Sequence, residues 1–231
     1  EITDVRVAGR SYTGTVCGLN QGVLQNISVL ESQKDIRENT GRSYVTGVRY
    51  VGGIAGSDLL KAGGSEKTEA NELPAESYKE LSNEAQISGG YCVGGIMGAS
   101  GIGSDQNKEK SATEKPGFIN CSNSGGIIAG VKANAYEKAV HMYLGGIVGY
   151  KKGGVITGCT SVMGKETLAD LENYGAAILY PDGFQDEESF FGDYIGGIAG
   201  YCEDECQVSK CETTGAVSYT HLRAHETAAN L

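Results

Sequence analysis

Apolar side chains and glycines recur along this chain in one short pattern: an aromatic residue, an apolar residue, two glycines, isoleucine, an apolar residue and a closing glycine. The pattern occurs five times, at residues 12–18, 50–56, 91–98, 143–149 and 194–200. A repeat of this kind decides the architecture before any single residue does, because every copy builds the same structural unit. The recurring residues are Tyr12, Gly14 and Gly18; Tyr50, Gly52, Gly53, Ile54 and Gly56; Tyr91, Gly94, Gly95, Ile96 and Gly98; Tyr143, Gly145, Gly146, Ile147 and Gly149; and Tyr194, Gly196, Gly197, Ile198 and Gly200.

Each copy is predicted to be a β-strand, because aromatic and β-branched residues favour strands. Strict alternation of apolar and polar residues fails, however, since the fifth and sixth positions are both apolar, as at Ile54 and Ala55. Either the strand is covered on both faces, or a bulge at the Gly-Gly pair redirects it. Gly53 and Gly146 are expected to need either positive φ or the close approach of another backbone.

Two further apolar stretches accompany the pattern in several units, for example at residues 156–159 and 126–131. Three short strands per unit predict a coil with three faces, and successive coils stack on one another. Polar spacers of variable length belong at the corners of such a stack, where they leave it undisturbed. These spacers cover residues 57–77, 100–116 and 165–191.

Some segments depart from the regular pattern. The first copy has Thr15 where the others have a second glycine, and the third copy carries one extra residue, Cys92, after its tyrosine. Residues 69–81 are rich in helix-forming residues and predict a short helix.

Charge and composition limit the partners. The formal net charge of −10 excludes nucleic acid and an anionic membrane surface, because both require a basic footprint. No apolar run approaches the length of about 18 residues that spans a bilayer, so no membrane insertion is expected in this segment. The chain begins at Glu1 without methionine, and we expect it to be a fragment or a processed product.

The phrase Tyr-x-Gly-Gly-Ile-x-Gly, followed at residues 150–159 by Tyr-Lys-Lys-Gly-Gly-Val-Ile-Thr-Gly-Cys, resembles the GLUG motif of bacterial surface proteins. The resemblance covers five units, over residues 12–215. It is also similar to the repeat-bearing N-terminal region of IgA1-protease-type surface metalloproteases. The resemblance implies a right-handed parallel β-helix in a secreted or cell-wall-attached protein, and it implies no activity in this segment.

Taken together, the sequence predicts an all-β, right-handed parallel β-helix (β-solenoid) of about five irregular coils with polar corner-loop insertions, over residues 1–217. We expect a non-catalytic extracellular scaffold without a cofactor, serving as a cell-surface stalk or adhesion module. Its partner would be a host or cell-surface macromolecule, protein or glycan. The alternative is an accessory domain of a larger secreted or wall-attached zinc metalloprotease. A His-Glu-x-x-His motif elsewhere in the protein would favour this alternative.

The five tyrosines of the pattern have two possible roles. They either stack between coils or line a lateral binding face. Carbohydrate cleavage on such a face needs clustered acids on neighbouring strands, and the strands are poor in acids. The isolated His141 is expected to be a side chain on a strand and not a catalytic residue.

The C-terminal segment, residues 218–231, abandons the repeat. It resembles the translated sequencing-adapter tail of assembled metagenomic reading frames, and we expect it to be non-native. His221 and His225 have the spacing of zinc ligands on a helix, but Leu222 stands where a zinc protease needs glutamate. We therefore expect no zinc site there.

Five of the seven cysteines form two overlapping groups, and the other two, Cys17 and Cys92, lie in copies of the repeated pattern. Cys121, Cys159 and Cys211 share one position of the repeat, which predicts a ladder of buried thiols in neighbouring coils more than a metal site. Cys202 and Cys206 form a local cluster with Cys211, and a disulfide from Cys206 to either of the others is possible in an oxidising setting.

Acidic residues gather in two places, at residues 182–193 and at Glu203, Asp204 and Glu205. Neither group follows a known calcium-binding spacing, so solvated acidic loops are expected. The nucleophile pattern Gly-x-Ser-x-Gly and the phosphate-loop pattern are both absent from the sequence.

Overall fold

The computed structural model describes residues 1–31, 43–58, 73–101, 115–129, 142–162, 178–179 and 194–214. Within these ranges the regular structure is entirely β-strand, and the strands pair in parallel. The same ranges contain no helix that is long and apolar enough to cross a membrane.

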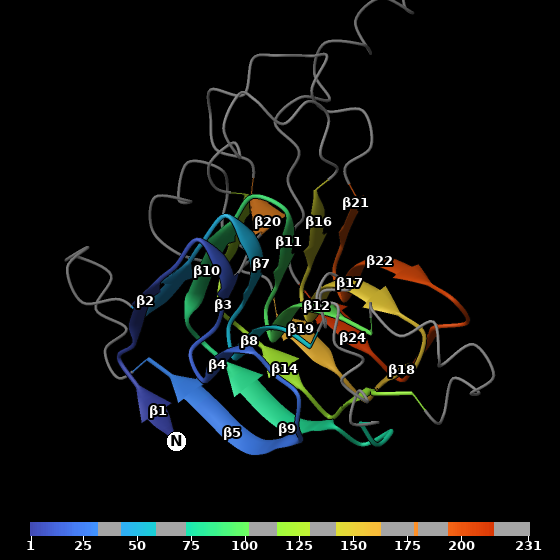
Figure 1. Cartoon of the computed structure of the whole chain (residues 1–231). Coiled ribbons are helices and arrows are strands. Elements are labelled where there is room, and N and C mark those ends of the chain that lie inside the picture. The colour runs from blue at the N-terminus through green and yellow to red at the C-terminus, as the bar shows by residue number, and fades with distance from the viewer. Residues whose placement is uncertain are drawn as a thin grey trace, which may run out of the picture.

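The strands form four parallel sheets, which we number I to IV in the order in which the chain visits them (Figure 1). Sheet I contains β2 (Arg6–Ala8), β6 (Tyr44–Thr46), β10 (Gln86–Gly89), β15 (Ile127–Ala129) and β20 (Ile178–Leu179). Sheet II contains β3 (Ser11–Thr13), β7 (Arg49–Gly52), β11 (Cys92–Gly94), β16 (Tyr143–Gly145) and β21 (Tyr194–Gly196). Sheet III contains β4 (Cys17–Leu19), β8 (Ala55–Ser57), β12 (Met97–Ser100), β17 (Val148–Lys152) and β22 (Ala199–Glu203).

Sheet IV contains one of the two further apolar stretches of each unit, the one found at residues 156–159. It contains β1 (Ile2–Thr3), β5 (Leu24–Leu30), β9 (Tyr78–Asn83), β13 (Phe118–Ile119), β14 (Ser122–Asn123), β18 (Val155–Thr157), β19 (Thr160–Val162), β23 (Gln207–Ser209) and β24 (Glu212–Thr214). The chain passes through sheets I, II, III and IV and then begins the next coil, five times in succession. The predicted all-β parallel solenoid of five coils is confirmed.

The prediction of three faces per coil is wrong, because the repeated phrase forms two strands and not one. In the second copy, β7 ends at Gly52, the chain turns at Gly53 and Ile54, and β8 begins at Ala55. Ile54 lies in this corner and Ala55 begins the next strand, and both are fully buried in the same core. The adjacent apolar pair therefore marks a corner that redirects the chain.

Two separate apolar cores follow from this path. Sheets I and II enclose a core that includes Val45 and Val51, and Figure 1 shows their strands rising together in the upper part of the molecule. Sheets III and IV enclose a larger core that includes Ala55, Leu81 and Phe118. The isoleucine of the corner between sheets II and III, for example Ile54, packs into this second core.

In each coil, one left-handed residue on sheet IV explains why the buried apolar residues of this sheet are three positions apart. Tyr78 and Leu81 are three residues apart, yet both are fully buried, because Glu80 between them has φ of 54°. A left-handed residue shifts the alternation of side chains along a strand, so residues i and i+3 face the same side. The corresponding residues in the other coils are Asn26, Asn120, Gly158 and Lys210.

The predicted helix over residues 69–81 is wrong where the structure describes it. Residues 78–81 belong to strand β9, which pairs with β5 on one side and with β13 and β14 on the other. The helix-like spacing of Tyr78 and Leu81 arises from the left-handed Glu80. Tertiary stacking overrides the local helix propensity of this segment.

Much of the predicted spacer sequence falls between strands, but β20 lies inside the predicted spacer of residues 165–191, and Ser57 and Ser100 end strands β8 and β12. Residues 59–72 and 102–114 separate sheet III from sheet IV, and residues 180–193 separate sheet I from sheet II. The corner between sheets II and III keeps the same length in all five coils. The candidate site lies beside this constant corner.

Candidate functional site

A row of five tyrosines runs across the coils on sheet II. The tyrosine row consists of Tyr12, Tyr50, Tyr91, Tyr143 and Tyr194. Tyr12 stacks on Tyr50 with ring centroids 4.9 Å apart, and Tyr143 stacks on Tyr194 at 5.3 Å. Tyr91 joins the two pairs through edge contacts of 5.5 Å to Tyr50 and 5.7 Å to Tyr143. The predicted stacking between coils is confirmed.

The third coil shows that the extra residue of its copy is the tyrosine and not Cys92. Cys92 pairs with Tyr143, and Val93 pairs with both Val51 and Leu144. Cys92 therefore occupies the tyrosine position of the strand and is buried. The side chain of Tyr91 fills the place that Cys92 leaves open in the row.

Two tyrosines of sheet III, Tyr150 and Tyr201, extend the row at the C-terminal coils. Tyr150 contacts Tyr143, and Tyr201 contacts Tyr194 at 5.0 Å between ring centroids. The Tyr150 hydroxyl donates a hydrogen bond to Glu203 Oε1. Burial is the main cause that raises the pKa of Tyr150, and the hydrogen bond to the Glu203 carboxylate is the second. Burial also raises the pKa of Tyr91 to about 12. Both phenols are therefore protonated hydrogen-bond donors at neutral pH.

The closing glycines bring sheets II and III together beneath the row. A Cβ atom on Gly18 would lie 2.2 Å from the carbonyl oxygen of Tyr12, and one on Gly149 would lie 2.6 Å from that of Tyr143. No side chain fits at such distances, so the backbones of the two sheets meet directly. The closing glycines of sheet III therefore lie directly against the backbone of the tyrosines of sheet II.

The second glycine of the pattern packs against a column of polar side chains inside sheet IV. A Cβ atom on Gly53 would lie 2.4 Å from Asn83 Cγ, and one on Gly95 would lie 2.3 Å from Asn123 Cγ. Neither glycine has positive φ, so close approach is the reason for glycine here. The polar column contains Asn83, Asn123, Ser161 and Thr213, one in each of coils two to five.

The asparagines of this column also fix the next corner. Asn83 Nδ2 donates to the carbonyl oxygen of Ala85, and Asn83 Oδ1 accepts from the Ala85 N–H. Asn123 makes the same pair of bonds with Gly125. Valine stands at this register position in the first coil, as Val29, and that coil also has Thr15 in place of the second glycine.

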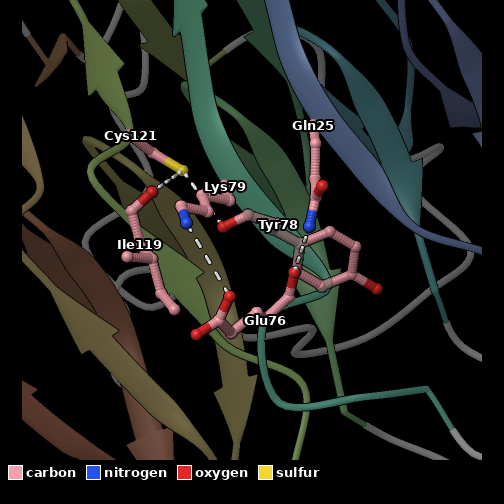
Figure 2. Close-up of polar contacts among 6 residues, drawn as sticks. All are labelled: Gln25, Glu76, Tyr78, Lys79, Ile119 and Cys121. Carbon is pink, nitrogen blue, oxygen red and sulfur yellow. Dashed lines mark hydrogen bonds and ion pairs between the residues drawn. The ribbon is translucent and has the colours of Figure 1, made fainter.

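The cysteine ladder lies where the sequence predicted it. Cys121, Cys159 and Cys211 occupy one register position of sheet IV, and each donates a weak hydrogen bond to a carbonyl group of the preceding coil. Figure 2 shows Cys121 directed at the carbonyl oxygens of Tyr78 and Ile119. All seven cysteines are free thiols in this structure.

A second polar column, which the sequence analysis missed, lies at the corner between sheets III and IV. Ser100, Lys151 and Cys202 are register partners there, and Asp58 precedes them by one coil. Asp58 accepts hydrogen bonds from the Tyr78 hydroxyl at 2.6 Å, the Ser100 hydroxyl at 2.8 Å and the Gly101 N–H at 2.8 Å. The signal available in the sequence was the repeated polar residue shortly after each closing glycine.

Lys151 is the most unusual member of this column. Its side chain is completely buried, and Nζ has no hydrogen-bond partner. Burial lowers the pKa of Lys151, and the neighbouring Asp58, Cys206 and Cys202 act in the opposite direction. A buried amine without a partner carries a large desolvation cost, so its position calls for a functional explanation.

The remaining predicted groups divide between the described and the undescribed residues. Glu203 and Asp204 lie in the described part and form ion pairs with Lys152 at 3.7 Å and 3.3 Å. His141, the acids of residues 182–193 and the tail of residues 218–231 lie outside the described residues, as does most of each long spacer. Among the described residues no group of three or more His, Cys, Asp or Glu side chains has the arrangement of a metal site.

No protein-family model, no curated protein and no solved structure matches the chain. The repeat-like stack of parallel strands is therefore established by the geometry alone, and a bacterial surface role belongs to the proposal that follows.

Proposed function

We propose that this chain is a non-catalytic extracellular scaffold of a bacterial protein, a cell-surface stalk or adhesion module. The observation that carries the proposal is the tyrosine row, which crosses all five coils on the outside of sheet II. The glycines and isoleucines of the same repeat are used by packing at the corner. A surface that repeats from coil to coil suits a partner that is itself extended.

The chemistry of the row indicates what kind of partner it accepts. The ring faces stack in the pairs Tyr12–Tyr50 and Tyr143–Tyr194, and Tyr91 meets both pairs in edge contacts, so ring edges and hydroxyl groups are what most of the row offers to a ligand. Protonated phenols donate hydrogen bonds, and aromatic edges contribute apolar contact. The net charge of −10 disfavours a polyanion. We therefore propose an uncharged glycan chain at a host or cell surface as the partner.

Binding to an array of neutral glycans tests this proposal. Tyr194 is the row residue most open to solvent, with 38% of its surface exposed. Tyr44 is a matched control, because it is 39% exposed but lies on β6 in sheet I, away from the row. We expect Tyr194→Ala to weaken binding and Tyr44→Ala to leave it unchanged. Equal binding by both variants and the parent chain would remove the tyrosine row as the binding surface.

A further inference from the structure

Two cysteines and one lysine meet at the corner between sheets III and IV of the last coil. Cys202 lies on β22 and Cys206 immediately precedes β23. The turn between them contains Asp204 and Glu205, both left-handed with φ of 50° and 58°. Two consecutive left-handed residues reverse the chain direction tightly, and both cysteines pack against the same apolar core.

Lys151 is the neighbour of this pair in the preceding coil. Its Cα is the register partner of the Cα of Cys202, and it acts electrostatically on both thiols. Corner backbone encloses its amine, because Cβ atoms on Gly154 and Gly101 would lie 3.0 Å and 3.4 Å from Nζ. Both corners have positive φ, which lets the chain close over the amine without side chains.

The buried amine has few candidates for a counter-charge. Asp58 is the nearest carboxylate that acts on it, but both Asp58 oxygens already accept hydrogen bonds from Tyr78, Ser100 and Gly101. Lys115 is a like charge that opposes the ammonium form. The Cys202–Cys206 pair is the remaining group that favours the positive charge.

We propose that Cys202 and Cys206 form a thiol–disulfide site, in which Cys206 is the attacking thiolate, Lys151 supplies the positive charge beside it, and the substrate is a low-molecular-weight disulfide. Hydrogen bonding from Cys202 lowers the pKa of Cys206, and Lys151 acts in the same direction. Thiolates beside a cation are the reactive cysteines of proteins. The site is independent of the glycan-binding proposal, since none of its residues belongs to the tyrosine row.

The reaction balances without any other reagent. Cys206 Sγ attacks one sulfur of the substrate disulfide, forms a mixed disulfide and releases one thiolate. Cys202 then loses its proton, attacks Cys206 Sγ and displaces the second thiolate. The two protein thiols are oxidised to one disulfide, and the substrate disulfide is reduced to two thiols. The product would tie the end of β22 to the start of β23 in the last described coil.

Oxidised glutathione with the full chain tests the proposal, with mass analysis of alkylated peptides as the readout. We expect a Cys202–Cys206 disulfide, while the buried Cys121 and Cys159 stay reduced. Cys202→Ser should trap glutathione on Cys206, and Cys206→Ser should leave Cys202 largely unmodified. Modification of Cys202 in Cys206→Ser at the parent rate would overturn the assignment of the attacking thiol.

The role of Lys151 is tested by rate. Because the ammonium lowers the pKa of Cys206, Lys151→Met should slow glutathione transfer by about threefold, since the higher nucleophilicity of a less acidic thiol offsets part of the lost thiolate fraction. Lys152→Met is the matched control, since Lys152 is the next residue but pairs with Glu203 and Asp204. An unchanged rate in Lys151→Met, with folding verified by thermal unfolding, would refute the electrostatic role.

Discussion

The side-chain amide of Asn83 donates a hydrogen bond of 2.8 Å to Asn123 Oδ1, one coil further along the solenoid. Both side chains are buried and both also bind the backbone of the following corner. The pair therefore connects the vertical stacking of coils with the shape of each coil. It also explains why the facing positions, Gly53 and Gly95, have no side chain.

Removing one partner of this pair should destabilise the fold. We expect Asn123→Ala to lower the free energy of unfolding by about 1–3 kcal/mol, because buried polar groups of Asn83 and Gly125 lose their partner. Urea unfolding followed by circular dichroism measures the change. Ser122→Ala on the same strand is the control, since Ser122 is exposed. A loss no larger than that of the control would argue against a structural role for the polar column.

The second glycine of the pattern should not tolerate a side chain. Gly53→Val places its Cβ within 2.2 Å of the Gly95 carbonyl oxygen and 2.4 Å of Asn83 Cγ, so the coils must separate locally. We expect a loss of about 3 kcal/mol or more, or failure to fold. Gly22→Ala is the matched control, because its nearest atom would be 3.9 Å away and its φ is not positive. Comparable midpoints of denaturation for the two variants would contradict the close-approach explanation.

The left-handed position of sheet IV predicts a stabilising substitution. Glu80 has φ of 54°, whereas two other coils use asparagine there, at Asn26 and Asn120. Asparagine tolerates this conformation better than glutamate, so Glu80→Asn should raise the free energy of unfolding by about 0.5–1 kcal/mol. Gln86→Asn on β10 has no such reason to stabilise. The prediction fails if both asparagine variants lower the thermal midpoint equally.

Lys151 predicts a pH dependence whose sign follows from burial. Its folded-state pKa is lowered, so the unfolded chain binds more protons between that value and the unfolded value near 10.4. Stability of the parent chain should therefore rise with pH through this window, relative to Lys151→Met. At neutral pH we expect Lys151→Met to be more stable by about 1–4 kcal/mol, because an unpaired buried amine is replaced by an apolar side chain.

Parallel denaturation series of the parent and Lys151→Met between pH 7 and pH 10 provide the measurement. The difference between the two curves should shrink as the pH rises, since the parent loses its desolvation cost when Lys151 deprotonates. A constant difference across the range would show that Lys151 does not titrate differently in the folded state.

Some features of the fold could be predicted from the sequence, and others could not. The five-fold phrase predicted stacked parallel coils, and the shared position of Cys121, Cys159 and Cys211 predicted a thiol ladder, because identical residues at one repeat position must meet in a stack. The phrase did not reveal that it contains two strands. Ile54 and Ala55 are adjacent apolar residues in either case, and only the structure shows that Ile54 lies in a corner and that both side chains enter the same core.

Other features stayed hidden for a physical reason. Lys151 looks like a surface residue in sequence, since it stands beside a second lysine, Lys152, and just before two glycines. Its burial depends on the corners at Gly101 and Gly154, which belong to different coils. The helix-forming residues at 69–81 likewise predicted a helix, because local propensity does not show that Tyr78 and Leu81 join a strand with one left-handed residue, Glu80.

The sequence by itself determined the repeat, the absence of helical periodicity within it, the excess of acidic residues and the positions of the repeated glycines, where side chains are missing. The tertiary structure decided why they are missing: Gly53 faces Asn83, and Gly18 faces the backbone of Tyr12. It also decided that the tyrosines gather in one row and that Lys151 lies beside Cys202. A repeat specifies which residues are equivalent, whereas the contacts between different positions of the repeat depend on how sharply each corner bends.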